Sequence, residues 1–543
     1  MTLTTHNEYP KRLIEVDLPI ARISAHARRE KSIRHGHIST LHIWWARRPL
    51  AACRAVLCAS LWPDPVDLTA WAERGEEIPV GDGSVIVRPR RFLETARERM
   101  TAWANQHLGK VSKESYSRFV AIQNGAKTLA DPLDLQRGLL DFIADFANWD
   151  NSTDKDYLET ARALTQASHE ALGGESETRP LVVDPFCGGG SIPLEALRVG
   201  ADAFASDLNP IPVLLNKVVL EYIPKYGQRL ADEVRKWGAW IKQEAEKELA
   251  EFYPKDPDGA TPIAYLWART IQCEGPGCGA EVPLMRSLWL AKKGKQSVAL
   301  RIVPKPQDKR VDFEIIENAK ASEEKSGTVK RGSATCPCCG YTTPQKSVRQ
   351  QLCSRGGGTN DARLLAVVYK IFSQSGVIFK LPSQRDKQRN EVTSIELARR
   401  FANLIPTEKI LSKNQSDVGR MPLYGIKTYG SLFNSSQLLT LLSLTELINK
   451  LSLIGEEALA VKLALACALD KQVDYLSTLA RWHTTGLFVN NTYGRQALPM
   501  VWDFVEGNPF SGASGNFINA VEWVAKFLER EGAALVDVSA GQS

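Results

Sequence analysis

The sequence Pro180-Leu-Val-Val-Asp184-Pro-Phe-Cys-Gly-Gly-Gly-Ser191 predicts a strand, a glycine turn and the start of a helix. An apolar run ends at an acid, a glycine turn follows, and Ser191 can cap a helix behind it. Glycines let the backbone approach a ligand closely at the carboxyl end of a strand. The later run Ala203-Phe-Ala-Ser-Asp207 predicts the next strand, which again ends in an acid. Together the two runs predict a βαβ unit whose second carboxylate can hold ribose hydroxyls.

The glycine turn alone leaves another interpretation open, because a tight turn that binds no ligand has the same sequence pattern. Phosphate binding fits the turn less well. The chain contains no Gly-Lys-Ser or Gly-Lys-Thr, and the turn begins with Pro-Phe-Cys rather than Gly-x-Gly.

Length and composition set the outer limits. The chain has 543 residues, 43% hydrophobic and 24% charged, with a net charge of +6. This is ordinary for a globular protein of about three or four domains, and the charge excess is too small to indicate nucleic-acid binding by itself. The sequence shows no apolar run of the roughly 18 residues that span a bilayer, and its start lacks a signal-peptide pattern. We therefore expect a cytoplasmic location.

A basic opening lies between Arg22 and Arg54, with eight Lys or Arg residues, one acid (Glu30) and the pair Trp44-Trp45. Cations beside aromatic rings suit phosphate contacts and base stacking. A solvated basic face over two core tryptophans is the plainer interpretation of any single residue. A histidine metal site is a minor alternative, since four histidines lie here without a cluster of acids.

Paired cysteines indicate a metal site. Cys273 and Cys278 form one pair and Cys336 and Cys339 the other, and both pairs stand among glycines. Such knuckles are typical of tetrahedral structural zinc, with no open position for catalysis. Cys338 is expected to be a spare thiol. The alternative is four unpaired surface cysteines. Two β-like runs between the pairs predict a hairpin, Ser297–Val303 with Val311–Ile316.

The string Asp-Pro-Phe-Cys-Gly-Gly-Gly resembles motif I of S-adenosylmethionine-dependent amino-methyltransferases, and Asp207-Leu-Asn209-Pro210 resembles their motif II. The resemblance implies that the loop surrounds the methionine part of the cofactor and that Asp207 binds its ribose. By the same resemblance the other cofactor contacts on these motifs are Asp184, Phe186, Gly188, Gly190 and Asn209. Cys187 is expected to be a small filler.

The stretch Lys11–Pro63 is similar to the DUF1156 domain, which opens a family described as adenine-specific DNA methylases containing a zinc ribbon. Its segment Leu41-His-Ile-Trp-Trp-Ala-Arg-Arg-Pro-Leu50 resembles a segment that packs over the cofactor in many amino-methyltransferases. The resemblance implies that Trp45, Arg47 and Pro49 lie near the cofactor. It also agrees with a zinc ribbon at the paired cysteines.

One expected motif is missing. Amino-methyltransferases carry Asp/Asn-Pro-Pro-Tyr/Phe, whose polar groups bind the target amine and whose ring stacks on a flipped base. The sequence lacks this tetrapeptide, so the catalytic residues are unknown. The nearest string, Asn508-Pro509-Phe510, is expected to be a turn, because Val505–Gly507 does not resemble a buried strand. Arg495–Phe510 and Tyr429–Leu438 resemble family segments, although Ser436 stands where the family usually has Arg.

We therefore expect either a truncated or split gene product, or a chain whose catalytic motif is supplied by another polypeptide. By itself the chain should bind the cofactor poorly and methylate little or nothing. The expected fold is α/β, a Rossmann-like methyltransferase sheet interrupted by helical insertions and a β-rich zinc ribbon. The expected parts are a DUF1156-like basic segment (1–63), a helical insertion (64–175), the cofactor-binding βαβ unit (176–226), a helical connector (227–265), the zinc ribbon (266–345) and a mixed, then helical region (346–543).

The function implied by the resemblance is S-adenosylmethionine-dependent methylation of DNA adenine at N6, with structural Zn²⁺ and DNA as partner. The target base would be extruded and its amine would attack the methyl group directly. Two alternatives remain. One is an RNA base N-methyltransferase, because similar loops occur in tRNA guanine methylases. The other is a nucleic-acid-binding subunit without catalysis.

Overall fold

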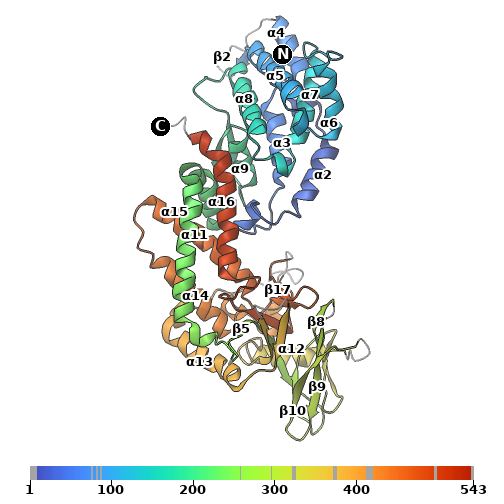
Figure 1. Ribbon diagram of the computed structural model, residues 1–543, viewed down its shortest axis with the longest axis vertical. Helices are drawn as coiled ribbons and strands as arrows, with labels where there is room; N and C mark the ends of the chain where they lie inside the picture. The colour runs from blue at the N-terminus through green and yellow to red at the C-terminus, as the bar shows by residue number, and fades with distance from the viewer. Residues whose placement is uncertain are drawn as a thin grey trace, which may run out of the picture. The chain divides into compact units, whose positions relative to one another are not determined.

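The computed structural model describes residues 9–74, 78–80, 83–85, 88–256, 258–294, 296–320, 326–370, 376–410, 420–494 and 498–539. The chain divides into two units. Unit 1 consists of Met1–Glu233, Ile454–Ala464 and Trp523–Ser543, and unit 2 of Val234–Leu453 and Leu465–Glu522. Together the units form a mixed α/β protein with many helices and several small sheets (Figure 1).

Helices dominate the first part of unit 1. Several of them begin with a side-chain cap, as at Ser112, Asp131 and Asp154. Their core is aromatic, and the Nε1–H of Trp103 donates to Thr160 Oγ1 at 3.0 Å. The elements are α1 (Leu13–Val16), α2 (Ile20–Glu30), α3 (Leu50–Leu61), α4 (Pro65–Arg74), the hairpin β1 (Ile78–Val80) and β2 (Gly83–Val85), α5 (Pro89–Gln106), α6 (Lys113–Gln123), α7 (Pro132–Phe146) and α8 (Lys155–Ala171).

A parallel βαβ unit follows the helices. Strand β3 (Leu181–Asp184) pairs in parallel with β4 (Asp202–Ala205), and α9 (Ser191–Arg198) connects them. Helix α10 (Pro210–Lys217) begins after β4. Within the described residues no other strand pairs with β3 or β4. The expected βαβ unit is therefore present, whereas the larger Rossmann-like sheet is not shown.

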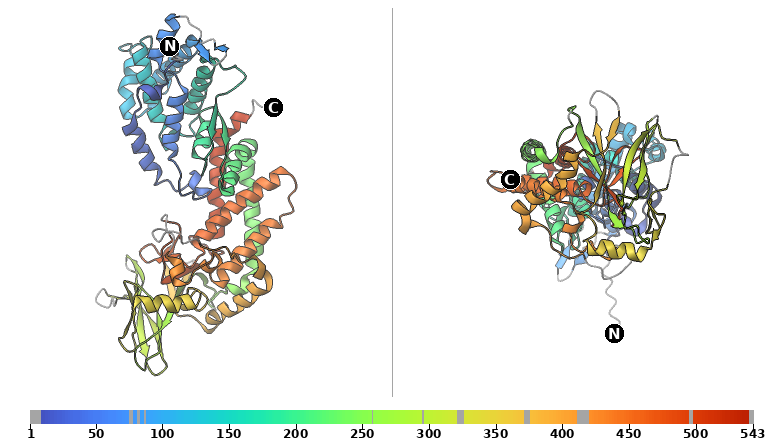
Figure 2. Two further views of the ribbon diagram at one scale, coloured as in Figure 1. Left: turned by 180° about the vertical axis from the view of Figure 1, so that it is seen from behind. Right: turned by 90° about the horizontal axis from the view of Figure 1, so that it is seen from below.

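Unit 2 is built on a four-stranded antiparallel sheet in the order β15-β14-β5-β18. Its strands are β5 (Thr261–Ala268), β14 (Arg363–Lys370), β15 (Val377–Lys380) and β18 (Asp503–Gly507). A second sheet contains β8 (Trp289–Lys293), β9 (Gln296–Lys305) and β10 (Arg310–Glu317), drawn yellow-green in Figure 2. The hairpin expected from Ser297–Val303 and Val311–Ile316 is the antiparallel pair β9–β10.

Both faces of the central sheet are buried, because side chains of β5 alternate between two apolar clusters. Tyr265 and Trp267 pack in one cluster with Leu397 of α13 (Gln384–Phe401) and Leu439 of α14 (Ser435–Asn449). Leu266 packs in the other with apolar residues of the second sheet. The helices of this unit include α12 (Gln345–Ser354), α13 (Gln384–Phe401) and α14 (Ser435–Asn449).

Three long helices contribute residues to both units: α11 (Ile223–Glu248), α15 (Glu456–Tyr475) and α16 (Phe517–Ser539). Helix α11 is interrupted at Gly227, where φ is 50° and ψ is −129°. A non-glycine residue would rarely adopt that conformation. Of the helices that the structure describes, none is long and apolar enough to cross a membrane.

One local expectation is wrong. Val505–Gly507 belongs to the buried strand β18, which pairs with β5 in the register Val505 to Leu266. Asn508 and Pro509 follow it in a turn, as expected. The charge of Glu506 conceals this strand in the sequence, because its carboxylate is neutralised within the core by Arg389.

Candidate functional site

The glycine loop leaves the end of β3 and enters α9. Asp184 Oδ1 accepts a hydrogen bond from the N–H of Phe186 at 3.2 Å, which turns the chain at once. Gly188 and Gly190 have φ angles of 48° and 77°, in the left-handed region that favours glycine. The loop therefore needs glycine at both positions.

The second acid meets this loop. Asp207 Oδ2 accepts a hydrogen bond from the N–H of Gly188 at 3.0 Å, and Oδ1 accepts one from the N–H of Asn209 at 2.9 Å. Asn209 in turn caps α10 by accepting from the N–H of Ile211 at 3.0 Å. Because β3 and β4 are parallel, the predicted loop and the predicted acid lie together at their carboxyl ends.

The N-terminal segment covers the glycine loop. A Cβ atom added to Gly188 would lie 2.7 Å from Trp44 Nε1, and one added to Gly189 would lie 3.1 Å from Arg47 Nε. Trp44 is thus the tryptophan against the loop, while Trp45 is exposed and Pro49 precedes α3. The resemblance implied a contact from Trp45 rather than from its neighbour Trp44. Because the Trp44 indole lies so close to Gly188 and Gly189, packing alone would also explain why glycine occupies these positions.

Three buried polar atoms around the loop have no hydrogen-bond partner among the described residues. They are Arg47 Nε, Ser191 Oγ and Asn216 Oδ1. The Nδ2 of Asn216 is engaged, because it donates to the carbonyl oxygen of Gly188 at 3.2 Å. Burial lowers the pKa of the Arg47 guanidinium to about 10. Since unsatisfied buried polar atoms are costly and rare, the loop offers unused polar contacts to a ligand.

Two large apolar side chains next to the loop face solvent. Phe186 is 79% exposed and Leu208 is 96% exposed. Phe186 lies two residues after the end of β3, and Leu208 lies three residues after the end of β4. The site therefore combines carboxylates, unpaired polar atoms and exposed apolar groups.

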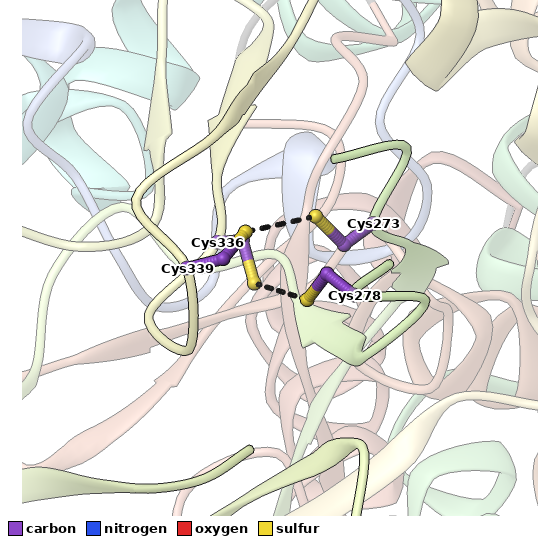
Figure 3. A group of neighbouring side chains, drawn as sticks. All are labelled: Cys273, Cys278, Cys336 and Cys339. Atoms are coloured by element: carbon purple, nitrogen blue, oxygen red, sulfur yellow. Dashed lines mark hydrogen bonds between the residues drawn. The ribbon is translucent and has the colours of Figure 1, made fainter. Parts of the chain in front are cut away.

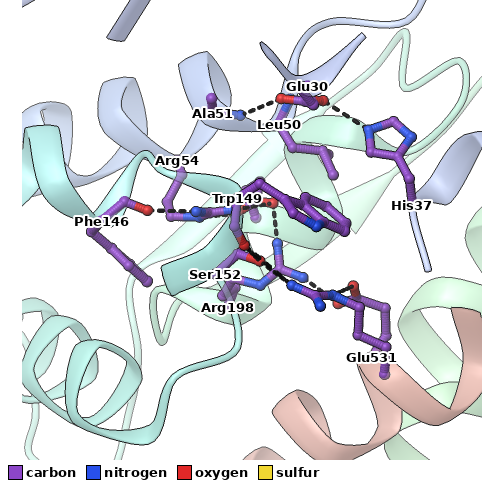
Figure 4. A network of polar contacts seen from close by, with 12 residues as sticks. Glu30, His37, Leu50, Ala51, Arg54, Phe146, Trp149, Ser152, Arg198 and Glu531 are labelled. Carbon is purple, nitrogen blue, oxygen red and sulfur yellow. Dashed lines mark hydrogen bonds and ion pairs between the residues drawn. The ribbon is translucent and has the colours of Figure 1, made fainter. Parts of the chain in front are cut away.

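Of the Lys and Arg residues of the basic opening, Arg54 is buried in unit 1. Five others are exposed, namely Arg28, Arg29, Lys31, Arg34 and Arg48. Arg54 is buried and donates from Nε to Glu195 Oε2 at 2.7 Å, which joins α3 to α9 (Figure 4). Arg198 pairs with Glu195 and also with Glu531 of α16. Arg54 is therefore a structural ion partner and does not belong to a free basic surface.

His37 lies in the same region and is a partner of Glu30, with 2.8 Å between Nε2 and Oε1. Burial alone would raise the pKa of Glu30, but hydrogen bonds from His37 and from the backbone of Leu50 and Ala51 lower it overall. Both groups are thus engaged within the fold. Among the described residues, the group of side chains able to hold a metal ion is found elsewhere, at four cysteines.

The sulfur atoms of Cys273, Cys278, Cys336 and Cys339 all lie within 4.8 Å of one another. Two loops face each other there (Figure 3), with 3.5 Å between the sulfurs of Cys273 and Cys339 and 3.8 Å between those of Cys278 and Cys336. Zn–S bonds of about 2.3 Å in a tetrahedron require sulfur separations of about 3.8 Å. The four cysteines can therefore hold a metal ion, as the sequence predicts.

Short strands position the two knuckles. Cys273 and Cys278 lie between β6 (Thr270–Gln272) and β7 (Glu281–Pro283), and the other pair lies between β12 (Ser333–Thr335) and β13 (Thr342–Thr343). Gly275 is required, because a Cβ there would lie 2.8 Å from Tyr341 Cβ. Burial raises the pKa of Cys273, whereas a backbone hydrogen bond from Tyr341 lowers that of Cys339. Cys338 lies outside the cluster, with its thiol donating to the carbonyl oxygen of Arg310 at 3.3 Å.

The string Asn508-Pro509-Phe510 does not form a site for an amine. The Nδ2 of Asn508 donates to the carbonyl oxygen of Pro262 at 2.8 Å, and its Oδ1 accepts from the N–H of Phe510 at 2.9 Å. Phe510 packs edge-on against Tyr253. Both ends of the amide are therefore used to hold the turn.

Comparisons with known proteins identify one region of the chain. Neither the curated proteins nor the solved structures contain a match. Residues 17–78 match the family model DUF1156, described as a protein of unknown function, so this segment is similar to that family.

Proposed function

We propose that the chain is the cofactor-binding portion of an S-adenosylmethionine-dependent DNA methyltransferase of the adenine-N6 type. The observation that carries this proposal is the hydrogen bond of 3.0 Å between the N–H of Gly188 and Asp207 at the carboxyl ends of two parallel strands. In open α/β sheets, ligands bind at this end of the strands. The similarity of the opening segment to DUF1156 adds support.

The unpaired polar atoms suggest how the cofactor would be held. Asp207 would accept hydrogen bonds from the ribose hydroxyls, as the family resemblance implies. Arg47 Nε would pair with the α-carboxylate, and Asn216 Oδ1 would accept from the α-ammonium group. Both atoms are buried and have no partner in the part of the chain that the structure describes. When bound, the cofactor supplies an electrophilic methyl group. The chain would contribute its binding and orientation.

We further propose that a second polypeptide completes the sheet and carries the catalytic motif. Leu181, Val183 and Phe204 of β3 and β4 are 61%, 57% and 55% exposed. Parallel strands are normally covered on both faces, so apolar side chains on an open face suggest an absent neighbour. DNA would be the shared substrate of the completed enzyme.

The cofactor site is tested by titrating S-adenosylmethionine into the full chain and following its NMR spectrum, which detects weak binding. We expect Asp207→Ala to weaken binding by roughly tenfold or more, because charged hydrogen bonds contribute about 1.5–3 kcal/mol. Asp202→Ala, at the opposite end of β4, is the matched control and should bind like wild type. A folded Asp207→Ala variant with wild-type affinity would refute the assignment of the ribose site.

The four cysteines are proposed to hold a structural zinc ion. Their donor set is closed and tetrahedral, which leaves no position for a substrate. The expected content is about one zinc per chain, and its removal should destabilise unit 2.

Adjacent cysteines provide the test. Cys339→Ser should lose most of the bound zinc and lower the melting temperature, while Cys338→Ser should keep both at wild-type values, because Cys338 lies outside the cluster. Metal analysis and thermal melting give the two readouts. Equal zinc contents in the two variants, or none in folded wild type, would contradict the proposal.

A nucleic-acid-binding subunit without methyl transfer is the second candidate. It is favoured by Trp44, whose indole already lies against the loop where the cofactor would bind. Transfer of labelled methyl groups to DNA or to RNA separates the candidates, since the binding subunit should label neither. Transfer of the label to RNA but not to DNA would instead indicate an RNA base methyltransferase.

A further inference from the structure

A second candidate surface lies in unit 2, beside the cysteine cluster. Residues 327–360 contain five Lys or Arg residues and no Asp or Glu, although acids and bases are nearly balanced in the chain as a whole. This segment forms the short strands β11 (Val329–Lys330), β12 and β13 and the helix α12. Four thiolates around Zn²⁺ would carry a formal charge of about −2, so the segment would remain positive with the metal bound.

The three strands form a small sheet in the order β11-β12-β13, and its two faces differ. Lys330 is the register partner of Ser333, and Thr335 is that of Thr342. Because side chains alternate along a strand, these four lie on one face of the sheet. Ser333 is half-buried and the other three are exposed. The opposite face is turned to the core, where Ala334 is buried.

Hydroxyl groups on the outer face retain hydrogen-bond donors. Thr335 Oγ1 and Thr342 Oγ1 lie 3.0 Å apart, so one hydroxyl donates to the other and the second keeps its own O–H. The hydroxyl of Ser333 makes no hydrogen bond within the part of the chain that the structure describes. Ser and Thr hydroxyls, together with Lys and Arg, are side chains that contact nucleic-acid phosphates. The outer face therefore has the chemistry of a phosphate-binding surface.

A tight turn presents Arg331 at the edge of this face. Arg331 and Gly332 are the two residues between β11 and β12, and their φ angles are 51° and 86°. Two-residue turns with two positive φ angles favour Asn, Asp or Gly, so arginine at the first position is unusual. A Cβ atom added to Gly332 would lie 2.5 Å from Gln345 Nε2, so the turn packs against the start of α12. The exposed Lys346 is the next residue of that helix.

The exposed cations of this segment are not neutralised by acids. Among the residues that the structure describes, Lys330, Arg331 and Lys346 form no ion pair. The other two cations of the segment are engaged, Arg355 by an acid and Arg349 by an aromatic ring. Three unpaired charges beside the hydroxyl groups attract an anionic partner.

We infer that the outer face of β11–β13, with the Arg331 turn and the start of α12, binds the phosphate backbone of double-stranded DNA. A duplex carries a dense row of phosphates, which cations and hydroxyls contact without reading bases. Single strands are usually held by aromatic rings on which bases stack, and none of the four side chains on this face is aromatic. Binding should therefore be independent of sequence.

The choice of DNA rests on the proposed function, whereas the phosphate-binding surface does not. The two proposals can fail separately, because Asp207→Ala reports on the methyl-donor site of unit 1 and the variants below report on unit 2. DNA binding without cofactor binding would refute only the proposed function. Cofactor binding without DNA binding would refute only this inference.

The test is fluorescence anisotropy of the full chain with a labelled DNA duplex, at salt concentrations from about 50 to 200 mM. We expect the triple variant Lys330→Gln/Arg331→Asn/Lys346→Gln to bind roughly tenfold or more weakly. Its slope of log affinity against log salt should fall by about three, because each phosphate contact contributes about 0.9 to that slope. Asparagine tolerates the positive φ of the turn, so the fold should be kept. Circular dichroism and zinc content check that it is.

The matched control is Arg385→Gln/Lys387→Gln/Arg399→Gln, which removes the same charge from exposed positions of α13 in the same unit. It should bind the duplex like wild type. Duplex RNA and single-stranded DNA of the same sequence complete the test, and both should bind more weakly than duplex DNA.

Four results would overturn the inference. They are no duplex binding by wild type, an unchanged salt slope in the folded ribbon variant, an equal loss in the α13 control, and tighter binding of duplex RNA or single-stranded DNA than of duplex DNA.

Discussion

Glu506 shows how one residue can hide a strand. It is fully buried, yet its carboxylate is paired with Arg389 and accepts hydrogen bonds from Trp267, Asn434 and Ser436. An acid in a short apolar run normally indicates exposure, so the sequence predicts a turn region here. The partners come from other elements, and a linear sequence does not show which of them meet.

We expect Glu506→Leu to destabilise the protein by about 3–5 kcal/mol, because it leaves Arg389 buried without its counter-ion. Chemical unfolding measured by circular dichroism provides the value. Glu314→Leu on β10 is the matched control, since Glu314 is exposed and its loss should cost less than about 1 kcal/mol. Similar losses in the two variants would show that the buried pair does not hold β18.

At the scale of single elements, the βαβ unit could be predicted because its signals are local. The apolar run before Asp184, the glycines and the cap before α10 all lie next to the structure they determine. The cysteine cluster was predictable for the same reason, as each knuckle is a short turn. The buried role of Arg54 could not be predicted, because its partner Glu195 is 141 residues away and only the folded chain brings α3 to α9.

Arg54→Met should therefore cost about 3–5 kcal/mol of stability, because it removes one partner of a buried ion pair. Arg29→Met is the control within the same basic opening. Its exposed pair with Asp150 should contribute less than about 1 kcal/mol. Urea unfolding of the two variants tests the comparison. If Arg54→Met were as stable as Arg29→Met, the opening would not be anchored to α9 through this arginine.

In the molecule as a whole, strands β3 and β4 leave one apolar face exposed to solvent. Val183 and Phe204 are register partners, so they lie on the same face, and both are exposed. Helix α9 contacts β3 and β4 on the covered side, and its Leu194 is fully buried. A chain in water normally covers such a surface.

The double variant Leu181→Ser/Val183→Thr should change stability by no more than about 0.5 kcal/mol, because the side chains are already exposed. Leu194→Ala on the covered side should cost about 2–5 kcal/mol. Urea unfolding compares them. A large loss in the double variant would mean that this face is packed in solution, and the proposal of a missing covering polypeptide would fail.

The buried pair of Arg198 with Glu531 also has a consequence for synthesis on the ribosome. The two residues are 333 positions apart, so Arg198 and its helix leave the exit tunnel long before their distant counter-ion is made. Unit 1 is assembled from three separated stretches, so we expect its folding to be completed only after α16 is made, although domains generally fold from the N-terminus onward. Until α16 is made, Arg54 and Arg198 share Glu195, and the second carboxylate of this buried group is still missing.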